Sequence, residues 1–201
     1  MEPTDKRAVA FFDGQNLFHA VKAAFGYSYP NFDPGRLAEA ACLSKGWHLV
    51  QSRFYTGVPA ASASPVWHRF WTGKLNAMRK AGIVVQSRPL RYRWQEPEVP
   101  GGAGTLVGQE KGVDVRIAID VIRMAHHREY DVAVIFSQDQ DLSEAAKEIR
   151  EIAREQSRWI KVASAFPAGE AARSPRGIDR TDWVPFHRIA YDACLDLTAY
   201  R

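Results

Sequence analysis

The chain has 201 residues, 46% of them hydrophobic and 25% charged, which is an ordinary composition for a globular protein with an apolar core. Its length suits one compact domain, or a domain with a short tail. The net charge of +4 permits a nucleic-acid partner without requiring one. Cys42 and Cys194 are far apart and belong to no metal-binding pattern, which argues against a zinc site or a disulfide framework. The chain shows no signal-peptide pattern and no apolar stretch long enough to span a membrane, so we expect a cytoplasmic protein.

Strand and helix signals alternate through the first half of the chain. An apolar run over 8–12 stops at Asp13 and Gly14, which predicts a buried strand and a tight turn. Helical spacing follows over 17–24, and Asp33 before Pro34 is a typical start for a second helix over 34–43. The next predicted elements are a strand over 48–55, a helix over 67–82 and a strand from 83 that could continue into 89–94.

The same alternation continues in the second half. Residues 95–108 are rich in proline and glycine and predict a flexible loop. The elements expected after it are a helix over 109–127, a strand over 131–137, a helix from about 141, a strand over 159–166, a loop over 167–180 and a short helix after 185. This order predicts a mainly parallel sheet with helices on both faces. We expect residues 1–166 to form the domain and residues 167–201 an extension packed on it.

Acidic residues follow two of the predicted strands. Asp13 comes directly after the first strand, and Asp139 and Asp141 come directly after the strand over 131–137. In parallel sheets, ligands bind at the carboxyl ends of the strands. If these two strands are neighbours, three carboxylates converge there. Each residue also has a purely structural interpretation, as a turn residue or a helix cap.

Asp114 strengthens the case for an acidic site. Ile117, Ala118, Val121 and Ala125 lie on its side of the predicted helix, so we expect its carboxylate on the apolar face. A buried carboxylate needs a metal or a cationic partner. Glu110 lies one turn earlier and adds a second negative charge, while Lys111 could pair with these carboxylates or contact a phosphate.

Three polar residues are candidates for supporting roles. Asp120 falls between Arg116 and Arg123 on the polar side of the same predicted helix, where we expect a solvated ion-pair cluster, with a supporting role at the site left open. Asn16 could orient a carboxylate, water or phosphate, or its only role could be a hydrogen bond at the start of its helix. Ser137 could orient Asp139 through its hydroxyl, or it could simply be the last residue of its strand.

Oxygen ligands without histidine or cysteine favour the hard cations Mg²⁺ or Mn²⁺. Carboxylates that share metal ions suit in-line attack on phosphorus, because the metal activates water and stabilises the leaving oxygen. This pattern predicts a metal-dependent enzyme that cuts phosphodiester bonds.

Four segments of the chain resemble the NYN domain family of PIN-like metal-dependent ribonucleases, in its LabA-like branch. They are Phe12-Asp-Gly-Gln-Asn16, Arg88-Pro-Leu-Arg-Tyr-Arg93, Glu110-Lys-Gly-Val-Asp114 with the following residues to Asp120, and Ser137-Gln-Asp-Gln-Asp141. Their order matches the family over most of residues 8–166. The sequence departs from the family pattern at Gln138, where glycine is usual, and at Leu142, where phenylalanine is usual.

The resemblance implies a three-layer α/β/α sandwich with a mainly parallel sheet, in which the first strand and the strand over 131–137 are adjacent. It also implies that Asp13, Asp114, Asp139 and Asp141 hold Mg²⁺ or Mn²⁺, close to Asn16. The implied substrate is RNA, and we expect it to be single-stranded. A homodimer is left open.

Basic and aromatic residues alternate in the middle of the chain, and this mixture suits single-stranded RNA. The basic members are Arg53, Arg69, Lys74, Arg79, Lys80, Arg88, Arg91 and Arg93. Among these, Arg88, Arg91 and Arg93, together with the aromatic Trp94, are the preferred contacts because they lead into the loop before Asp114. Trp67, Phe70 and Trp71 have helical spacing, which favours core packing.

Two other functions remain open on the sequence alone. A module of the same fold could bind RNA or a protein without cutting. A phosphatase is a third reading, although Gln15 stands where a haloacid-dehalogenase-type enzyme would carry a second aspartate. The chain has neither a P-loop nor a dinucleotide-binding glycine fingerprint.

Overall fold

A computed structural model describes residues 1–96, 104–169 and 176–200. Its elements are β1 (Arg7–Asp13), α1 (Gly14–Phe25), α2 (Pro34–Leu43), β2 (His48–Val58), α3 (Pro65–Lys80), β3 (Val84–Pro89), β4 (Arg91–Gln95), β5 (Thr105–Gln109), α4 (Val113–His126), β6 (Val132–Phe136), the 3₁₀ turn η1 (Gln140–Leu142), α5 (Ser143–Glu155), β7 (Lys161–Pro167), β8 (Asp182–Phe186) and α6 (Arg188–Asp192). Parts of two predicted loops, residues 97–103 and 170–175, lie outside the described residues.

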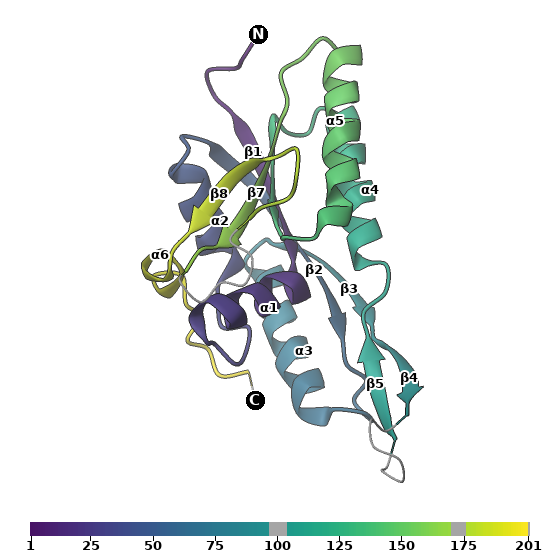
Figure 1. Ribbon diagram of the computed structural model, residues 1–201. Helices are drawn as coiled ribbons and strands as arrows, with labels where there is room; N and C mark the ends of the chain where they lie inside the picture. Colours follow the sequence, from purple (N-terminus) through teal and green to yellow (C-terminus); the bar gives the residue numbers. More distant parts are fainter. Residues whose placement is uncertain (97–103, 170–175, 201) are drawn as a thin grey trace.

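Six strands form one sheet in the order β3-β2-β1-β6-β7-β8, and each neighbouring pair is parallel. The predicted adjacency of β1 and β6 is confirmed, with Phe12 in register with Phe136. Successive β1 residues point to opposite faces, as a strand requires. Phe12 packs in the core that α1, α2 and α3 cover, and Phe11 packs in the core under α4 and α5. The α/β fold with a parallel sheet between helical layers, as the sequence predicted, is therefore confirmed (Figure 1).

The expected loop over 95–108 contains a strand. β5 pairs antiparallel with β4, and the two form a separate hairpin that extends away from the main sheet at the end of β3 (Figure 1). The predicted helix start at residue 109 is also wrong, because residues 105–109 belong to β5. α4 begins only at Val113, after Gly112 turns the chain with a φ of 73°, a conformation that suits glycine.

The final part of the chain contributes a strand that the sequence analysis did not predict. β8 pairs with β7 and completes one edge of the sheet, and the predicted short C-terminal helix follows as α6. Phe186 and Tyr191 from this region pack in the core together with Phe25 of α1. No helix in the described part of the chain is long and apolar enough to cross a membrane.

Candidate active site

A hollow of about 410 Å³ opens where β1 and β6 end and α4 begins. It is lined by Asp13, Gln15, Asn16, Glu110, Lys111, Gly112, Val113, Asp114 and Asp139. Below, this space is called the carboxylate hollow. The structure thus brings four predicted acidic residues together from three separate segments. The sequence analysis did not propose Gln15, Gly112 or Val113 as site residues, although all three lie within motifs that it did identify.

Asp13 is the most deeply buried carboxylate of the hollow, with 5% of its surface exposed. It ends β1 and caps α1, because its Oδ1 accepts the backbone N–H of Asn16 at 3.1 Å. The Ser137 hydroxyl donates to its Oδ2 at 3.4 Å. The pKa of Asp13 is raised to about 6, chiefly by burial and also by the charges of Asp139 and Asp114, against the lowering effect of the two hydrogen bonds.

The segment after β6 is tied to the same place. The Asn16 side-chain oxygen accepts the backbone N–H of Gln138 at 2.9 Å, so it joins the start of α1 to the end of β6. Ser137 Oγ also accepts the backbone N–H of Asp139 at 3.1 Å, and therefore bonds the backbone of that residue and not its carboxylate. Asp139 caps η1, because its Oδ1 accepts the Asp141 N–H at 3.0 Å. Asp141 itself is exposed and does not line the hollow.

The other acidic residues come from the start of α4. Asp114 is half-buried in the first turn of the helix. Glu110 accepts the backbone N–H of Gly57, at the end of β2. The pKa of Glu110 is raised to about 7, chiefly by burial and also by the charges of Asp13 and Asp114, against the lowering effect of the bond from Gly57. Among the described residues that line the hollow, Lys111 is the one with a cationic side chain, and it is exposed.

The prediction that Asp120 belongs to a solvated surface cluster is wrong. Asp120 has no exposed surface, and it bonds Arg53 Nη2 at 3.1 Å, Tyr55 Oη at 2.9 Å and Arg116 Nη2 at 2.7 Å. Although burial acts to raise the pKa of Asp120, these hydrogen bonds hold it below the ordinary value. The buried stripe of α4 thus includes Asp120. Asp114 lies on the same side of the helix as the buried Ile117, Val121 and Ala125, as expected, but is itself only half-buried.

The predicted nucleic-acid contacts divide into two groups. Arg88, Arg91 and Arg93 are exposed on β3 and β4, and Trp94 is 65% exposed. Two other basic residues of the same region are instead buried in ion pairs, Arg53 with Asp120 and Lys74 with Asp196. The prediction for the aromatics of α3 is correct for Trp71, which is buried, and for Phe70, which packs against the core, whereas Trp67 is 39% exposed.

The chemistry of the carboxylate hollow suits a hard divalent cation. Among the described residues, no three acidic, histidine or cysteine side chains form a ready-made ligand cluster. Mg²⁺ does not need such a cluster, because it keeps several waters and binds proteins through one or two carboxylates. The donors here are carboxylate and amide oxygens, and Asp13 and Glu110 carry raised pKa values that a bound cation would lower.

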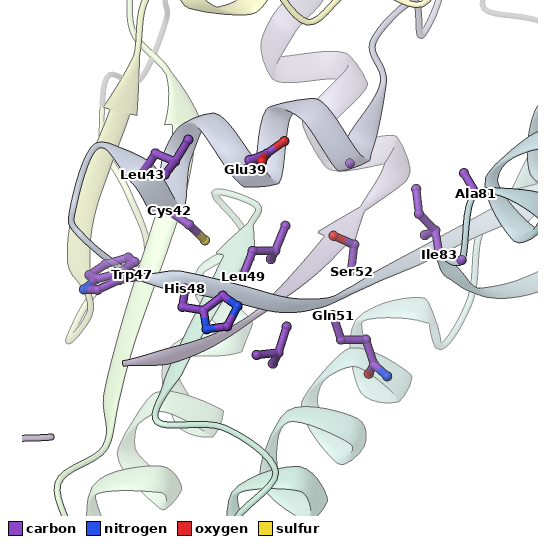
Figure 2. Close-up of a pocket in the computed structure, with 13 residues that line it drawn as sticks. Glu39, Cys42, Leu43, Trp47, His48, Leu49, Gln51, Ser52, Ala81 and Ile83 are labelled. Carbon is purple, nitrogen blue, oxygen red and sulfur yellow. The ribbon is translucent and has the colours of Figure 1, made fainter. Parts of the chain in front are cut away.

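A second hollow, of about 500 Å³, lies at the other end of the sheet between α2 and the beginning of β2 (Figure 2). Glu39 and His48 are its ionisable side chains, besides the buried thiol of Cys42. Burial raises the pKa of this thiol to about 12, so it is an inert thiol at neutral pH. The site with convergent carboxylates is therefore the one at the carboxyl ends of the strands.

Comparison with known proteins supports the same assignment. The sequence matches the NYN domain family over residues 7–173, and no curated protein matches it. Among solved structures, a Vibrio parahaemolyticus RIMD 2210633 protein of unknown function is 19% identical with a TM-score of 0.56, over 92% of this chain and 96% of that chain. Acinetobacter baumannii MurG, at 12% identity and a TM-score of 0.33 over 90% of this chain and 45% of its own, is too dissimilar to carry an argument.

The likeness to the Vibrio protein concerns the fold alone. The family match says more, because NYN domains are generally nucleases of PIN-like fold, and such nucleases typically use divalent metal ions and act on nucleic acid. The matched region includes every residue of the carboxylate hollow. The chain belongs to the NYN domain family.

Proposed function

We propose that the protein is a metal-dependent nuclease that hydrolyses phosphodiester bonds in single-stranded RNA inside the cytoplasm. The observation that carries the proposal is the carboxylate hollow, in which Asp13, Glu110, Asp114 and Asp139 meet at the carboxyl edge of the sheet in an NYN family member. We also propose that the chain belongs to the LabA-like branch of this family, because the motifs around Asp114 and Asp139 resemble that branch. We also propose that residues 167–201 are an extension of the same domain, since β8 pairs within the main sheet.

Asp13, Asp114 and Asp139 are the proposed metal ligands, and Mg²⁺ or Mn²⁺ is the proposed ion. A bound ion would supply a water activated for attack on phosphorus and would stabilise the leaving oxygen. Asp141 belongs to the same turn as Asp139 but does not line the hollow, so its proposed ligand role rests on the family resemblance. Asn16 and Ser137 hold these acidic segments together through the hydrogen bonds described above.

Glu110 and Lys111 complete the proposed site. Glu110 fixes the end of β2 to the segment that enters α4, and its carboxylate adds negative charge beside the ligands. Lys111 is suited to bind a phosphate oxygen at the rim, because its amine is exposed beside the hollow. The proposed RNA path continues over Arg88, Arg91 and Arg93, where Trp94 offers an exposed ring for a base to stack on.

The test is cleavage of labelled single-stranded RNA by the purified protein in Mg²⁺, Mn²⁺ or EDTA. Asp13→Asn and Asp139→Asn remove one carboxylate each, and Glu148→Gln removes an exposed carboxylate of α5 as the matched control. We expect metal-dependent cleavage by the wild type and by Glu148→Gln, and none by the two aspartate variants. A phosphatase substrate run in parallel separates RNA cleavage from phosphomonoester hydrolysis.

Two outcomes would contradict the proposal. Cleavage that persists in EDTA, or in both aspartate variants, would exclude the metal-aspartate mechanism. Tight RNA binding without any cleavage would favour the alternative, a module of this fold that binds RNA or a protein without cutting.

A further inference from the structure

A small cavity of about 70 Å³ lies beside the carboxylate hollow, between the start of α4 and strands β2 and β3. It is lined by Tyr55, Gln86, Ser87, Arg88, Val113 and Arg116, and is called the arginine cavity below. Val113 lines both spaces, so they share a wall. A water occupies ~30 Å³ in the liquid, so the arginine cavity has room for a group the size of a phosphate.

The arginine cavity lies at the edge of a cluster with excess positive charge. Asp120 is a single carboxylate, yet Arg53, Arg116 and Arg123 all approach it, at 3.1, 2.7 and 3.8 Å. Three guanidinium groups around one carboxylate leave two positive charges uncompensated within this cluster. Such an imbalance favours an anionic ligand close to the arginine that lines the cavity.

Arg88 brings a further positive charge from the opposite wall. Its Nη1 lies 3.0 Å from the position that a Cβ of Gly112 would occupy, so it reaches the turn before α4. Across the described residues, no hydrogen bond or ion pair of the Arg88 side chain is formed. Two guanidinium groups therefore face one small space, and guanidinium is the side-chain group best matched to phosphate oxygens.

Arg116 is held ready for such a ligand. Its Nη2 donates to Asp120, whose carboxylate is also bonded to Arg53 and Tyr55 of β2, so the guanidinium is fixed before anything binds. Its Nε is buried and has no hydrogen-bond partner. A buried donor without a partner is costly, and an anionic oxygen entering the cavity can satisfy it.

We propose that the arginine cavity binds a backbone phosphate of the nucleic-acid strand, adjacent to the phosphate held in the carboxylate hollow. Arg88 and Arg116 are its ligands, and Asp120 is a positioning residue that orients Arg116. This inference rests on the proposed nuclease function, because it assumes that the strand runs from one space to the other. In this proposal the buried Asp120, which is not a metal ligand, has the role of positioning Arg116.

The first experiment measures RNA binding without cleavage. The affinity of a fluorescein-labelled single-stranded oligoribonucleotide is followed in EDTA over a series of salt concentrations, for wild type, Arg88→Gln, Arg116→Gln and Arg123→Gln. Arg123 is the matched control, because it also approaches Asp120 but does not line the cavity. We expect binding roughly ten-fold weaker in the first two variants, and a salt slope reduced by about 0.7 for each lost phosphate contact. Arg123→Gln should bind as wild type does.

A second experiment tests whether one particular phosphate is recognised. Neutral methylphosphonate linkages are introduced one at a time along the oligoribonucleotide. One position should weaken binding to the wild type and to Arg123→Gln, but leave the affinity of Arg88→Gln unchanged. Arg88 is exposed, so this variant gives an answer even if Arg116→Gln does not fold.

The outcomes separate this proposal from the nuclease function. Equal affinity and equal salt slope in the wild type, Arg88→Gln and Arg116→Gln would overturn the cavity proposal, even if the wild type cleaves RNA. Suppose that neither the wild type nor any variant cleaves RNA, but that the effect of one neutral linkage on affinity disappears in the two arginine variants. The arginine-cavity proposal is then supported, and the proposed nuclease function is contradicted.

Discussion

At the scale of single residues, burial of Asp13 in the folded protein disfavours the charged form of its carboxylate. Its pKa is raised from 3.8 to about 6, so the folded protein holds a proton that the unfolded chain releases between these values. The stability of the metal-free protein should therefore fall as the pH rises from about 4 to about 6. The shift corresponds to at most about 3 kcal/mol. A carboxylate that is retained at such a cost is typical of a functional site.

We predict that Asp13→Asn stabilises the metal-free protein above pH 6 by about 1–3 kcal/mol. Asparagine keeps a side-chain oxygen that can accept the Asn16 N–H, so the α1 cap survives. Denaturant unfolding in EDTA, near neutral pH and near pH 4, measures the difference. The stabilisation should shrink at the lower pH, where Asp13 is protonated in the folded wild type.

Adding Mg²⁺ provides the internal control for this prediction. A ligand that binds only the folded state stabilises it, so wild type should gain stability and Asp13→Asn should gain less. If Asp13→Asn is no more stable than wild type in EDTA at neutral pH, the predicted effect of the raised Asp13 pKa on stability is contradicted.

Asp120 should behave in the opposite way. Removing one partner of a buried ion pair leaves the other charge uncompensated, so Asp120→Asn should destabilise the protein by about 3–5 kcal/mol near neutral pH. The loss should become smaller in acid, because hydrogen bonds keep the pKa of Asp120 below its ordinary value and its stabilising effect is lost as the pH falls through that pKa. Unfolding curves over a range of pH check both statements. An equal loss at every pH would argue against the charge as the cause.

At the scale of elements, the β4–β5 hairpin is the part of the proposed RNA path that extends furthest from the sheet (Figure 1). It is anchored at its base, because Tyr92 Oη accepts the backbone N–H of Ala60. Arg91 and Arg93 alternate with Tyr92 along β4 and therefore share a face of the hairpin. Both guanidinium groups are exposed and suited to phosphate contacts.

We predict that Arg91→Gln and Arg93→Gln each reduce the salt slope of RNA binding by about 0.7, with little change in the cleavage rate of bound RNA. Lys45→Gln is the control, because Lys45 is exposed just before β2 at the amino end of the strands. Salt titrations of binding and single-turnover cleavage give the two quantities. Unchanged slopes in both arginine variants would remove the hairpin from the RNA path.

The sequence was informative where a local pattern determines structure. The apolar runs of β1 and β6, and the acidic residues that follow them, placed Asp13 and Asp139 at one edge of the sheet. The position of Asp120 on α4 was misjudged, although a signal was present: it lies seven residues after Val113 and three after Ile117, on the buried stripe. β5 escaped prediction because Thr105–Gln109 contains a glycine and half-exposed residues, and only its pairing with β4 makes it a strand.

At the scale of the whole molecule, the end of the chain closes the core. Phe186 and Tyr191 are buried against residues of α1 and β6, and Tyr191 Oη donates to Asn31 Oδ1 at 2.7 Å. Further along, Asp196 accepts a bond from the buried Lys74 of α3. These contacts lie beyond the region that matches the NYN family, which ends at residue 173. We therefore propose that the folding unit extends beyond the region of the family match.

A chain that ends at Gly169 lacks β8, α6 and these contacts, and we predict that it does not fold cooperatively. Among the described residues, five buried core residues would be lost, namely Ile178, Val184, Phe186, Tyr191 and Cys194. Truncating one large core side chain costs about 2–5 kcal/mol, whereas a whole domain is stable by only about 5–15 kcal/mol. Deleting residues 1–4 is the control, because Met1 and Glu2 are exposed and no core residue lies among them. A cooperative thermal transition in the shortened chain, close to that of the control, would show that residues 170–201 are not needed for the fold.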